Sequence, residues 1–350
     1  MYHSKLCKLG RFKNTKMQIT SVHNNWKDNV LNIDLSLGNI CNYKCWYCWP
    51  GSNDGNYKWP DLDLLKTNIT HLINHYLENS NKKEIDIHFV GGEPTHWPKL
   101  FEFITFLKDN FNCLISMTSN GSKKLKWWKQ VAPYFDRIQI SCHQHYVDRE
   151  HLREICDMLY ENDVTVSVSV MMDPDCWNDC MSTVDYLKNS RHSWTIRYVE
   201  LVHDKIQYTE EQKNIIKNHR ARRVNWLWFW RHNKYYVSKI KVVDSKNKTY
   251  KFKDNEVLLK RLNNFHGWEC SVGVNWIHVG MDGTISGTCG QLLYGNLQNF
   301  NLYSNTFVKD FAPNIVPAIC TKTSCVCSIE TNMPKKQISS TTRVIPIYAD

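Results

Sequence analysis

Three cysteines lie within eight residues, in the segment CNYKCWYC at positions 41 to 48, with the spacing C-x3-C-x2-C. An odd cluster of three thiols cannot pair off in disulfides. The N-terminal residues MYHSKLCKLGRFKNTK contain no apolar run of signal-peptide length. We therefore expect a reducing compartment, the cytoplasm, and free thiolates that bind a metal centre.

Two metal centres compete for these thiolates. A structural zinc site closes its tetrahedron with four protein ligands, usually as two separated pairs, and three adjacent cysteines do not match that pattern. Three thiolates suit a [4Fe–4S] cube with one iron left open, although ligation by four cysteines is commoner. Fourteen cysteines in 350 residues is a high count for a cytosolic protein, where such patterns are more often metal-binding or catalytic than structural.

Length and charge set broad limits. A chain of 350 residues is about twice a typical domain, which favours one large barrel plus a smaller module. There is no apolar stretch of about 18 residues or more, so we expect no membrane span. The formal net charge of +10 permits an acidic partner, but lysines and asparagines are spread over the whole chain, and we expect no nucleic acid partner.

Strand and helix patterns alternate between about residues 30 and 203. This rhythm is typical of parallel strands joined by right-handed crossovers, and six units rather than eight predict a barrel that is not fully closed. The expected fold is α/β, a partial (β/α)6 barrel followed by a small α+β domain. The six strand patterns are VLNIDLSL (30–37), EIDIHFV (84–90), NCLISMTSNG (112–121), RIQISCHQ (137–144), VTVSVSVMM (164–172) and TIRYVELVH (195–203).

The alternation stops after residue 204, and the sequence divides into five segments. The stretch from Arg220 to Arg231 interleaves tryptophans with arginines. It is either a base-stacking and phosphate-binding platform or a strand packed between domains, and we favour the packed strand. The segments are an N-terminal arm (1–29), the partial barrel (30–204), a helical linker and β-rich connection (205–264), the small α+β domain (265–335) and a C-terminal tail (336–350).

The cysteine loop and one later motif together point to a family. Cys41, Cys45 and Cys48, with Tyr47 before the last cysteine and GGEP (91–94) after the second strand, resemble the radical S-adenosylmethionine (radical SAM) superfamily over about residues 30 to 203. The resemblance implies a [4Fe–4S] cluster held by the three cysteines, whose open iron binds the methionine moiety of SAM. It implies an external electron donor such as flavodoxin or ferredoxin, and a 5′-deoxyadenosyl radical that abstracts hydrogen from a substrate.

The resemblance also implies cofactor contacts. Gly91, Gly92 and Glu93 match the strand end that approaches the SAM amino group, where a side chain would be in the way. Tyr47 matches the aromatic residue beside the adenine. Structural roles stay open for Glu93 as a turn residue, for His143 as a core histidine and for Arg197 as a surface arginine. The remaining SAM or substrate contacts expected at strand ends or on the sixth strand are Asn120, Ser141, His143 and Arg197.

The last segment resembles the twitch or SPASM type of extension, which holds an auxiliary iron–sulfur cluster. A strand–turn–strand pattern with its turn at Met281 to Gly283 lies between the first two of its cysteines. Five cysteines are one more than a single cube needs and too few for a full two-cluster domain, so one auxiliary [4Fe–4S] cluster is expected. A zinc site stays an alternative, because four thiolates also bind zinc. The five cysteines are Cys270, Cys289, Cys320, Cys325 and Cys327.

The resemblance implies an enzyme, and we predict a peptide or protein side chain as its substrate. The alternatives are a nucleic-acid or nucleotide modifying radical SAM enzyme, a small-molecule dehydrogenase of the same superfamily, and a non-catalytic iron–sulfur or zinc binding protein. Cysteines within the predicted barrel elements are interpreted as small core residues: Cys113, Cys142, Cys156, Cys176 and Cys180.

Overall fold

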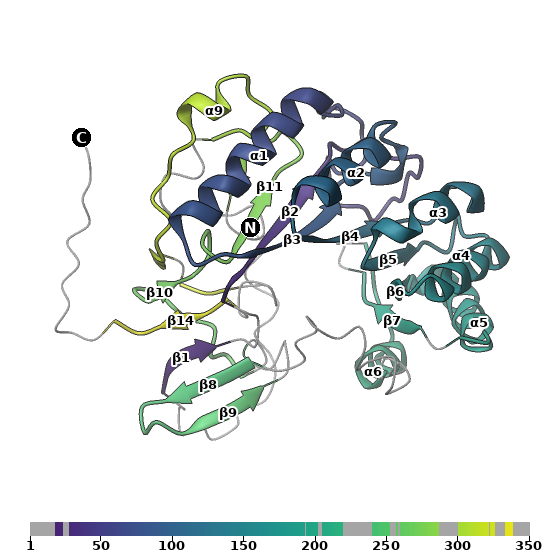
Figure 1. The fold of residues 1–350 in the computed structure, drawn as a ribbon. Helices are drawn as coiled ribbons and strands as arrows, with labels where there is room; N and C mark the ends of the chain where they lie inside the picture. Colours follow the sequence, from purple (N-terminus) through teal and green to yellow (C-terminus); the bar gives the residue numbers. More distant parts are fainter. Residues whose placement is uncertain are drawn as a thin grey trace. The chain divides into compact units, whose positions relative to one another are not determined.

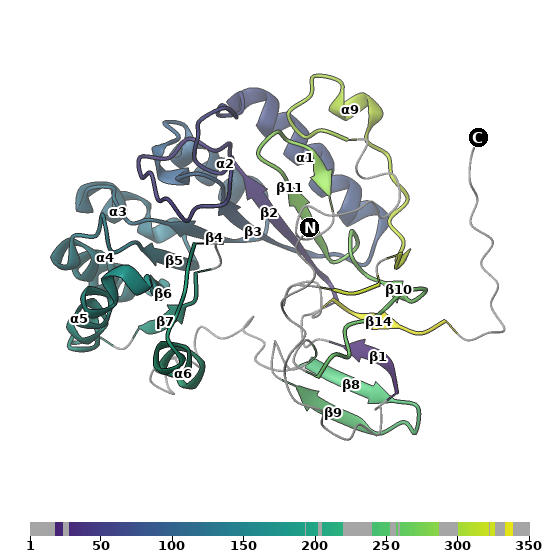
Figure 2. The same cartoon turned by 180° about the vertical axis from the view of Figure 1, so that it is seen from behind.

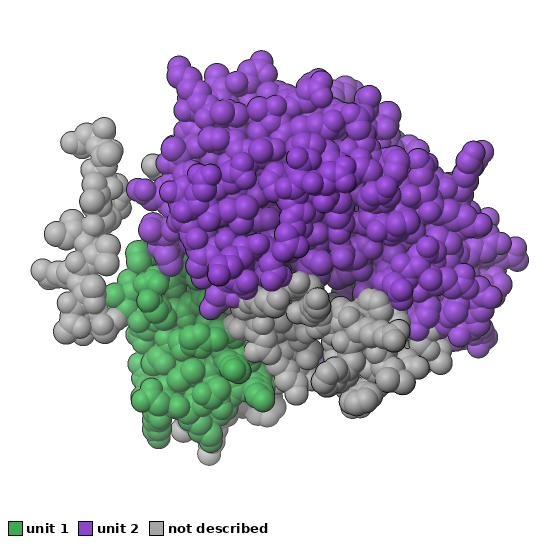
Figure 3. Space-filling view, in the orientation of Figure 1, with its two compact units in different colours: residues 1–25, 237–271, 319–350 green, residues 26–236, 272–318 purple. Residues whose placement is uncertain are grey.

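The computed structural model describes residues 18–23, 28–192, 194–201, 205–219, 240–252, 257, 260–286, 300–321, 323–325 and 333–338. The chain forms two compact units, coloured separately in Figure 3. Unit 1 comprises Met1–Asn25, Val237–Ser271 and Ile319–Asp350, and unit 2 comprises Trp26–Tyr236 and Val272–Ala318. No helix among the described residues is long and apolar enough to cross a membrane.

Unit 2 is built on an eight-stranded sheet with the strand order β12-β11-β2-β3-β4-β5-β6-β7 (Figure 1). All neighbouring pairs from β11 to β7 are parallel, and β12 is antiparallel to β11. This confirms the α/β class and the six strands expected of the partial barrel. The strands are β2 (Val30–Ser36), β3 (Glu84–Val90), β4 (Cys113–Ser119), β5 (Arg137–Cys142), β6 (Thr165–Met171), β7 (Thr195–Val199), β11 (Trp276–Val279) and β12 (Ile285–Ser286).

Helices follow the strands of unit 2 in alternation and cover one face of the sheet (Figures 1 and 2). Aspartates begin two of them, because Asp61 accepts from the Leu64 N–H and Asp148 accepts from the N–H groups of Glu150 and His151. The helices are α1 (Leu62–Asn79), η1 (Pro94–His96), α2 (Leu100–Asn110), α3 (Leu125–Val131), η2 (Ala132–Tyr134), α4 (Arg149–Glu161), η3 (Pro174–Cys176), α5 (Trp177–Lys188), α6 (Glu210–Asn218) and α9 (Phe307–Asp310).

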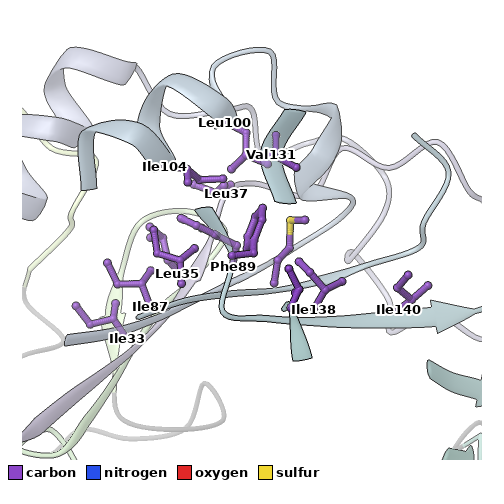
Figure 4. Packing of buried hydrophobic residues seen from close by; sticks show 14 of the residues in the cluster. Ile33, Leu35, Leu37, Ile87, Phe89, Leu100, Ile104, Val131, Ile138 and Ile140 are labelled. Carbon is purple, nitrogen blue, oxygen red and sulfur yellow. The ribbon is translucent and has the colours of Figure 1, made fainter. Parts of the chain in front are cut away.

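The core of unit 2 lies between this sheet face and the helices. Leu35, Ile87 and Phe89 point from the strands toward Leu100 and Ile104 of α2 (Figure 4), and all five are at most 1% exposed or fully buried. Side chains alternate along a strand, so the residues between these apolar positions lie on the opposite face. That face is polar, which is unusual because both faces of a parallel sheet are usually apolar.

Unit 1 contains a six-stranded sheet with the order β13-β10-β14-β1-β8-β9. The β8–β9 hairpin turns at residues 244 to 247, where the Asn247 N–H donates to the Asp244 carbonyl. Its apolar core includes Val22, Ile240, Phe265 and Trp268. The strands are β1 (Ile19–His23), β8 (Ile240–Asp244), β9 (Thr249–Phe252), β10 (Glu269–Cys270), β13 (Ala318–Ile319) and β14 (Lys335–Lys336).

These units divide the chain differently from the five predicted segments. Part of the expected N-terminal arm is strand β1, which lies between β8 and β14. The strand–turn–strand pattern assigned to the 265–335 domain is the hairpin β11–β12, which extends the sheet of unit 2 beside β2. Ile277 and Val279 are fully buried there. A strand of four residues does not carry enough information to specify which sheet edge it joins.

Candidate functional site

The cysteine loop follows β2 and precedes α1. Cys45 is buried and Cys41 and Cys48 are half-buried. The Cys48 N–H donates to the Cys45 carbonyl at 3.1 Å, and the Tyr43 N–H donates to Cys41 Sγ at 3.3 Å. Burial raises the pKa of the Cys45 thiol to about 11, so a bound cation is needed to keep this thiol ionised at neutral pH.

The two glycines after β3 pack against the backbone that leads into the cysteine loop. A Cβ on Gly92 would lie 2.3 Å from the Ile40 carbonyl oxygen, and one on Gly91 would lie 2.4 Å from that of Gly38. The Gly92 N–H donates to the Gly38 carbonyl and the Glu93 N–H to the Ile40 carbonyl, at 3.2 and 2.8 Å. These glycines therefore position the cysteine loop, whatever they contact in a complex with SAM.

Glu93 joins the ends of β3 and β4. One carboxylate oxygen accepts hydrogen bonds from the N–H and hydroxyl of Thr95 and from the Ser119 hydroxyl, and the other accepts from the Asn120 N–H at 2.6 Å. Only 1% of Glu93 is exposed. Burial raises its pKa although these four hydrogen bonds oppose the shift. Glu93 is thus a buried anchor, not a solvated turn residue, and its predicted SAM contact stays a prediction.

Aromatic residues connect the cysteine loop to the end of β5. The Tyr47 hydroxyl lies 2.9 Å from His143 Nδ1, and Cys45 Sγ lies 3.4 Å from the same nitrogen. Tyr43 stacks on Tyr146 with ring centroids 4.5 Å apart. Burial lowers the pKa of His143 to about 4, so its ring is neutral at physiological pH. Sequence reasoning missed Tyr146, whose only signal is its place after β5.

The remaining predicted contact residues lie either just after a strand of the unit 2 sheet or within one. Asn120 reaches the loop, where its side-chain amide donates to Asn42 at 2.9 Å and lies 4.0 Å from Cys41 Sγ. Ser141 and Arg197 both align with Ser169, which places them in one register row on the polar face. Their predicted cofactor contacts stay predictions.

A second group of potential ligands lies after the carboxyl ends of β5 and β6. His145, Asp173 and Cys176 have ligand atoms within 4.8 Å of one another. His145 Nε2 lies 3.1 Å from Asp173, which is 1% exposed and also accepts from the Asp175 N–H. Cys176 is half-buried, so it is less of a core residue than its sequence context predicted.

The loop cysteines fit an iron–sulfur cube better than a single ion. Among the described residues, the three thiols do not form a group with all ligand atoms within 4.8 Å, whereas Zn–S bonds of about 2.3 Å would hold tetrahedral thiolates roughly 3.8 Å apart. A [4Fe–4S] cube spaces its thiolates more widely because each binds a different iron. Cys48 raises the pKa of both Cys41 and Cys45, and Cys41 raises that of Cys45, so the three thiols face a shared region.

The structure describes three of the five predicted auxiliary cysteines. Cys270, Cys320 and Cys325 are buried, and all belong to unit 1. Backbone hydrogen bonds join their segments: the Cys320 N–H donates to the Trp268 carbonyl at 2.7 Å and the Cys325 N–H to the Asn263 carbonyl at 2.8 Å. Cys289 and Cys327 lie outside the described residues, as does the stretch from Arg220 to Arg231. The auxiliary cluster stays a prediction.

Comparison with known proteins identifies the domain around the cysteine loop. Residues 35–187 match the family model of the Radical SAM superfamily. This confirms the resemblance inferred from the three cysteines and GGEP. The matched range contains β3 to β6 and the loop, and therefore the whole arrangement described above except Arg197 and the auxiliary cysteines.

Similar curated proteins share only part of their length with this chain. GTP 3′,8-cyclase of Psychromonas ingrahamii is 38% identical over 91 residues, which is 25% of this chain and 24% of that protein. The probable GTP 3′,8-cyclase of Thermococcus kodakarensis is 29% identical over 115 residues, 33% of this chain and 35% of that protein. That of Saccharolobus islandicus is 30% identical over 124 residues, 35% of this chain and 37% of that protein. The chain thus spans about a quarter to somewhat over a third of the length of these relatives.

One solved structure is similar in outline, native anSMEcpe with bound AdoMet. Its TM-score is 0.49 and its sequence identity 15%, over 81% of this chain and 82% of that chain.

Proposed function

Because the chain carries a domain of the Radical SAM superfamily over residues 35–187, we propose that it cleaves SAM reductively with Cys41, Cys45 and Cys48 as ligands of a [4Fe–4S] cluster. Such a cluster would supply the electron that splits SAM into methionine and a 5′-deoxyadenosyl radical. The observation that carries the proposal is the position of the cysteine loop, whose leading backbone accepts hydrogen bonds from the N–H groups of Gly92 and Glu93 after β3.

The residues around the loop have separate roles in this proposal. Gly91 and Gly92 position the loop, and Glu93 fastens the end of β3 to that of β4. Tyr47 and His143 form a half-buried wall beside Cys45 that limits the access of water to the cluster. Asn120 reaches toward Cys41 and offers an amide to a polar group of SAM. Ser141 and Arg197 lie on the polar sheet face and stay candidates for SAM or substrate contact.

Reductive cleavage of SAM tests this function directly. Anaerobically reconstituted protein with dithionite is expected to convert SAM to methionine and 5′-deoxyadenosine, measured by chromatography. Replacement of Cys41, Cys45 and Cys48 by Ala is expected to abolish the conversion. Intact SAM after incubation with fully reconstituted, reduced protein would contradict the proposal.

For the substrate we propose a nucleoside triphosphate, the nucleotide alternative from the sequence analysis. The curated relatives named GTP 3′,8-cyclase favour it over a peptide or protein side chain. The net charge of +10 suits a polyphosphate. An auxiliary [4Fe–4S] cluster in unit 1 and an external donor such as flavodoxin or ferredoxin belong to the same proposal.

A panel of substrates separates the two classes. We expect GTP, compared with ATP, CTP, UTP and unrelated peptides, to increase the rate of 5′-deoxyadenosine formation and to yield a product of altered mass or chromatographic retention. Stimulation by peptides alone would restore the peptide prediction.

A further inference from the structure

The polar face of the unit 2 sheet carries a row of hydrogen-bonding side chains. Strand register aligns one residue from each of six neighbouring strands, and residues aligned in this way point to the same face. Their chain neighbours Ile33, Ile87 and Ile138 belong to the core beneath the helices, so the row faces away from the helices. The row consists of His278, Asp34, His88, Ser116, Arg137 and Thr165.

Arg137 and His88 of this row have hydrogen-bond partners in the row or beside it on the same face. Arg137 Nη2 donates to both carboxylate oxygens of Asp86 at 2.7 Å. His88 lies 2.8 Å from the Ser116 hydroxyl and 3.0 Å from that of Thr118. These contacts engage both oxygens of the Asp86 carboxylate and both ring nitrogens of His88.

Asp34 differs from its neighbours. Its Oδ2 accepts from the Trp276 indole N–H at 2.9 Å, while the described residues provide no hydrogen-bond partner for Oδ1. Burial raises the pKa of Asp34 to about 7, and the charge of Asp86 adds to this shift. Asp34 lies two residues before the end of β2, about 7 Å along the strand, on the strand that leads into the cysteine loop.

Two histidines and an ion pair face Asp34 from the neighbouring strands. His278 on β11 and His88 on β3 are in register with it, and burial lowers the pKa of both histidines, that of His88 to about 4. Asp86 on β3 is paired with Arg137 on β5. Among these described groups, Asp34 is the one whose pKa is raised to about 7.

We propose that Asp34 recognises the base of the nucleotide substrate, its carboxylate accepting hydrogen bonds from adjacent N–H groups of a guanine edge. The inference rests on the proposed function. A carboxylate offers two acceptor oxygens in one plane, which matches the ring N–H and the exocyclic amino group of guanine. Adenine, cytosine and uracil present no such pair of neighbouring donors.

Binding of GTP and ITP to the reconstituted full chain tests the inference. ITP lacks the exocyclic amino group but has the same triphosphate, so the phosphate charge cancels in the ratio of the two affinities. Equilibrium dialysis without reductant is expected to show about tenfold tighter binding of GTP at pH 8, because a hydrogen bond to a charged group is among the stronger kinds. At pH 6 the preference is expected to fall severalfold, since Asp34 is then mostly protonated.

Two variants distinguish recognition from a structural role. Asp34→Asn can still accept from Trp276, and it is expected to reduce the GTP preference to below about twofold at both pH values. Asp109→Asn changes an exposed aspartate of α2 in the same way and is expected to match the wild type. Trp276→Phe removes a hydrogen bond that lowers the pKa of Asp34, so the pH at which the preference appears is expected to rise.

The outcomes separate this inference from the function on which it rests. Wild-type protein that cleaves SAM but binds GTP and ITP equally at pH 8 would overturn the role of Asp34 and leave the proposed function standing. A GTP preference that persists in folded Asp34→Asn would do the same. Wild-type protein that prefers GTP but leaves SAM intact would instead contradict the proposed function.

Discussion

At the scale of single residues, the buried carboxyl group of Glu93 and the partly buried one of Asp34 have opposite surroundings. Glu93 accepts four hydrogen bonds that join two strand ends. Asp34 accepts one hydrogen bond, so the cost of burying its charge is not offset. Groups of this second kind reduce stability and are frequent at functional sites. The contrast is the physical reason for assigning substrate recognition to Asp34 and an anchoring role to Glu93.

The free energy of unfolding is expected to show how much the charge of Asp34 destabilises the fold. Its pKa is about 7 in the folded state against an ordinary value of 3.8, so the folded state holds the proton more tightly and stability falls as pH rises from about 4 to about 7. Asp34→Asn removes this loss. At pH 8 its free energy of unfolding in urea is expected to exceed that of the wild type, by up to about 4 kcal/mol.

Asp86→Asn provides the matched comparison for that experiment. Its carboxylate pairs with Arg137, and the amide would leave the guanidinium without its counter-charge. We expect a decrease in stability of about 1–3 kcal/mol at pH 8. If Asp34→Asn lowered stability as much as Asp86→Asn, the assignment of a destabilising charge to Asp34 would be wrong.

At the scale of elements, the junction between β3 and the cysteine loop decides whether the three thiols face one another. Two strand ends and the loop meet through backbone contacts. A side chain on Gly91 or Gly92 is excluded, because its Cβ would overlap with backbone atoms before the loop. Gly92 has no positive φ, so its requirement for glycine is one of space and not of backbone conformation. The GGEP motif therefore positions the loop, in addition to the SAM contact predicted for it.

Gly92→Ala is expected to impair the cluster itself as well as SAM binding. The new Cβ would lie 2.3 Å from the Ile40 carbonyl oxygen, so the backbone that leads into the loop has to move. Iron content after reconstitution and the rate of SAM cleavage are both expected to fall, the rate by about tenfold or more, since small displacements near reacting groups are costly.

Gly267→Ala is the control for Gly92→Ala. Gly267 has a positive φ and no atom within 4 Å of the added Cβ. It is therefore expected to lose about 1 kcal/mol of stability and to keep iron at the loop site. Full iron content with weakened SAM binding in Gly92→Ala would show that the glycine serves SAM alone.

At the scale of the whole molecule, the two proposed metal sites belong to different sheets. The sheet of unit 2 positions Cys41, Cys45 and Cys48, and unit 1 contains the described cysteines of the proposed auxiliary site. Unit 1 is assembled from three separate segments of the chain, with β1 between β8 and β14. The two metal centres are therefore expected to respond separately to substitution.

Iron content in two sets of variants tests this separation. Cys270→Ala/Cys289→Ala is expected to lose roughly four irons per chain, one cube, while SAM cleavage continues without substrate turnover. Replacement of Cys41, Cys45 and Cys48 by Ala is expected to retain the auxiliary iron and abolish SAM cleavage. Loss of zinc rather than iron from the first variant would identify a structural zinc site.

Much of unit 2 could be predicted because its signals are local. Apolar alternation and helical spacing identified β2 to β7 and the helices between them, and Cys41, Cys45 and Cys48 with GGEP identified the family. A short loop has to place its own ligands, so ligand spacing survives in the sequence. His143 and Asn120 could be named because they follow strand ends that meet at one edge of a parallel sheet.

What only the tertiary structure decided are the partners of short and isolated segments. The four residues of β11 join β2 and not the auxiliary cysteines, β1 pairs with strands more than 200 residues away, and Trp276 reaches Asp34 across 242 positions. Asp34 itself reads in the sequence as an ordinary polar residue of an alternating strand. Its raised pKa comes from burial and from Asp86, and both depend on three-dimensional packing that local sequence patterns do not encode.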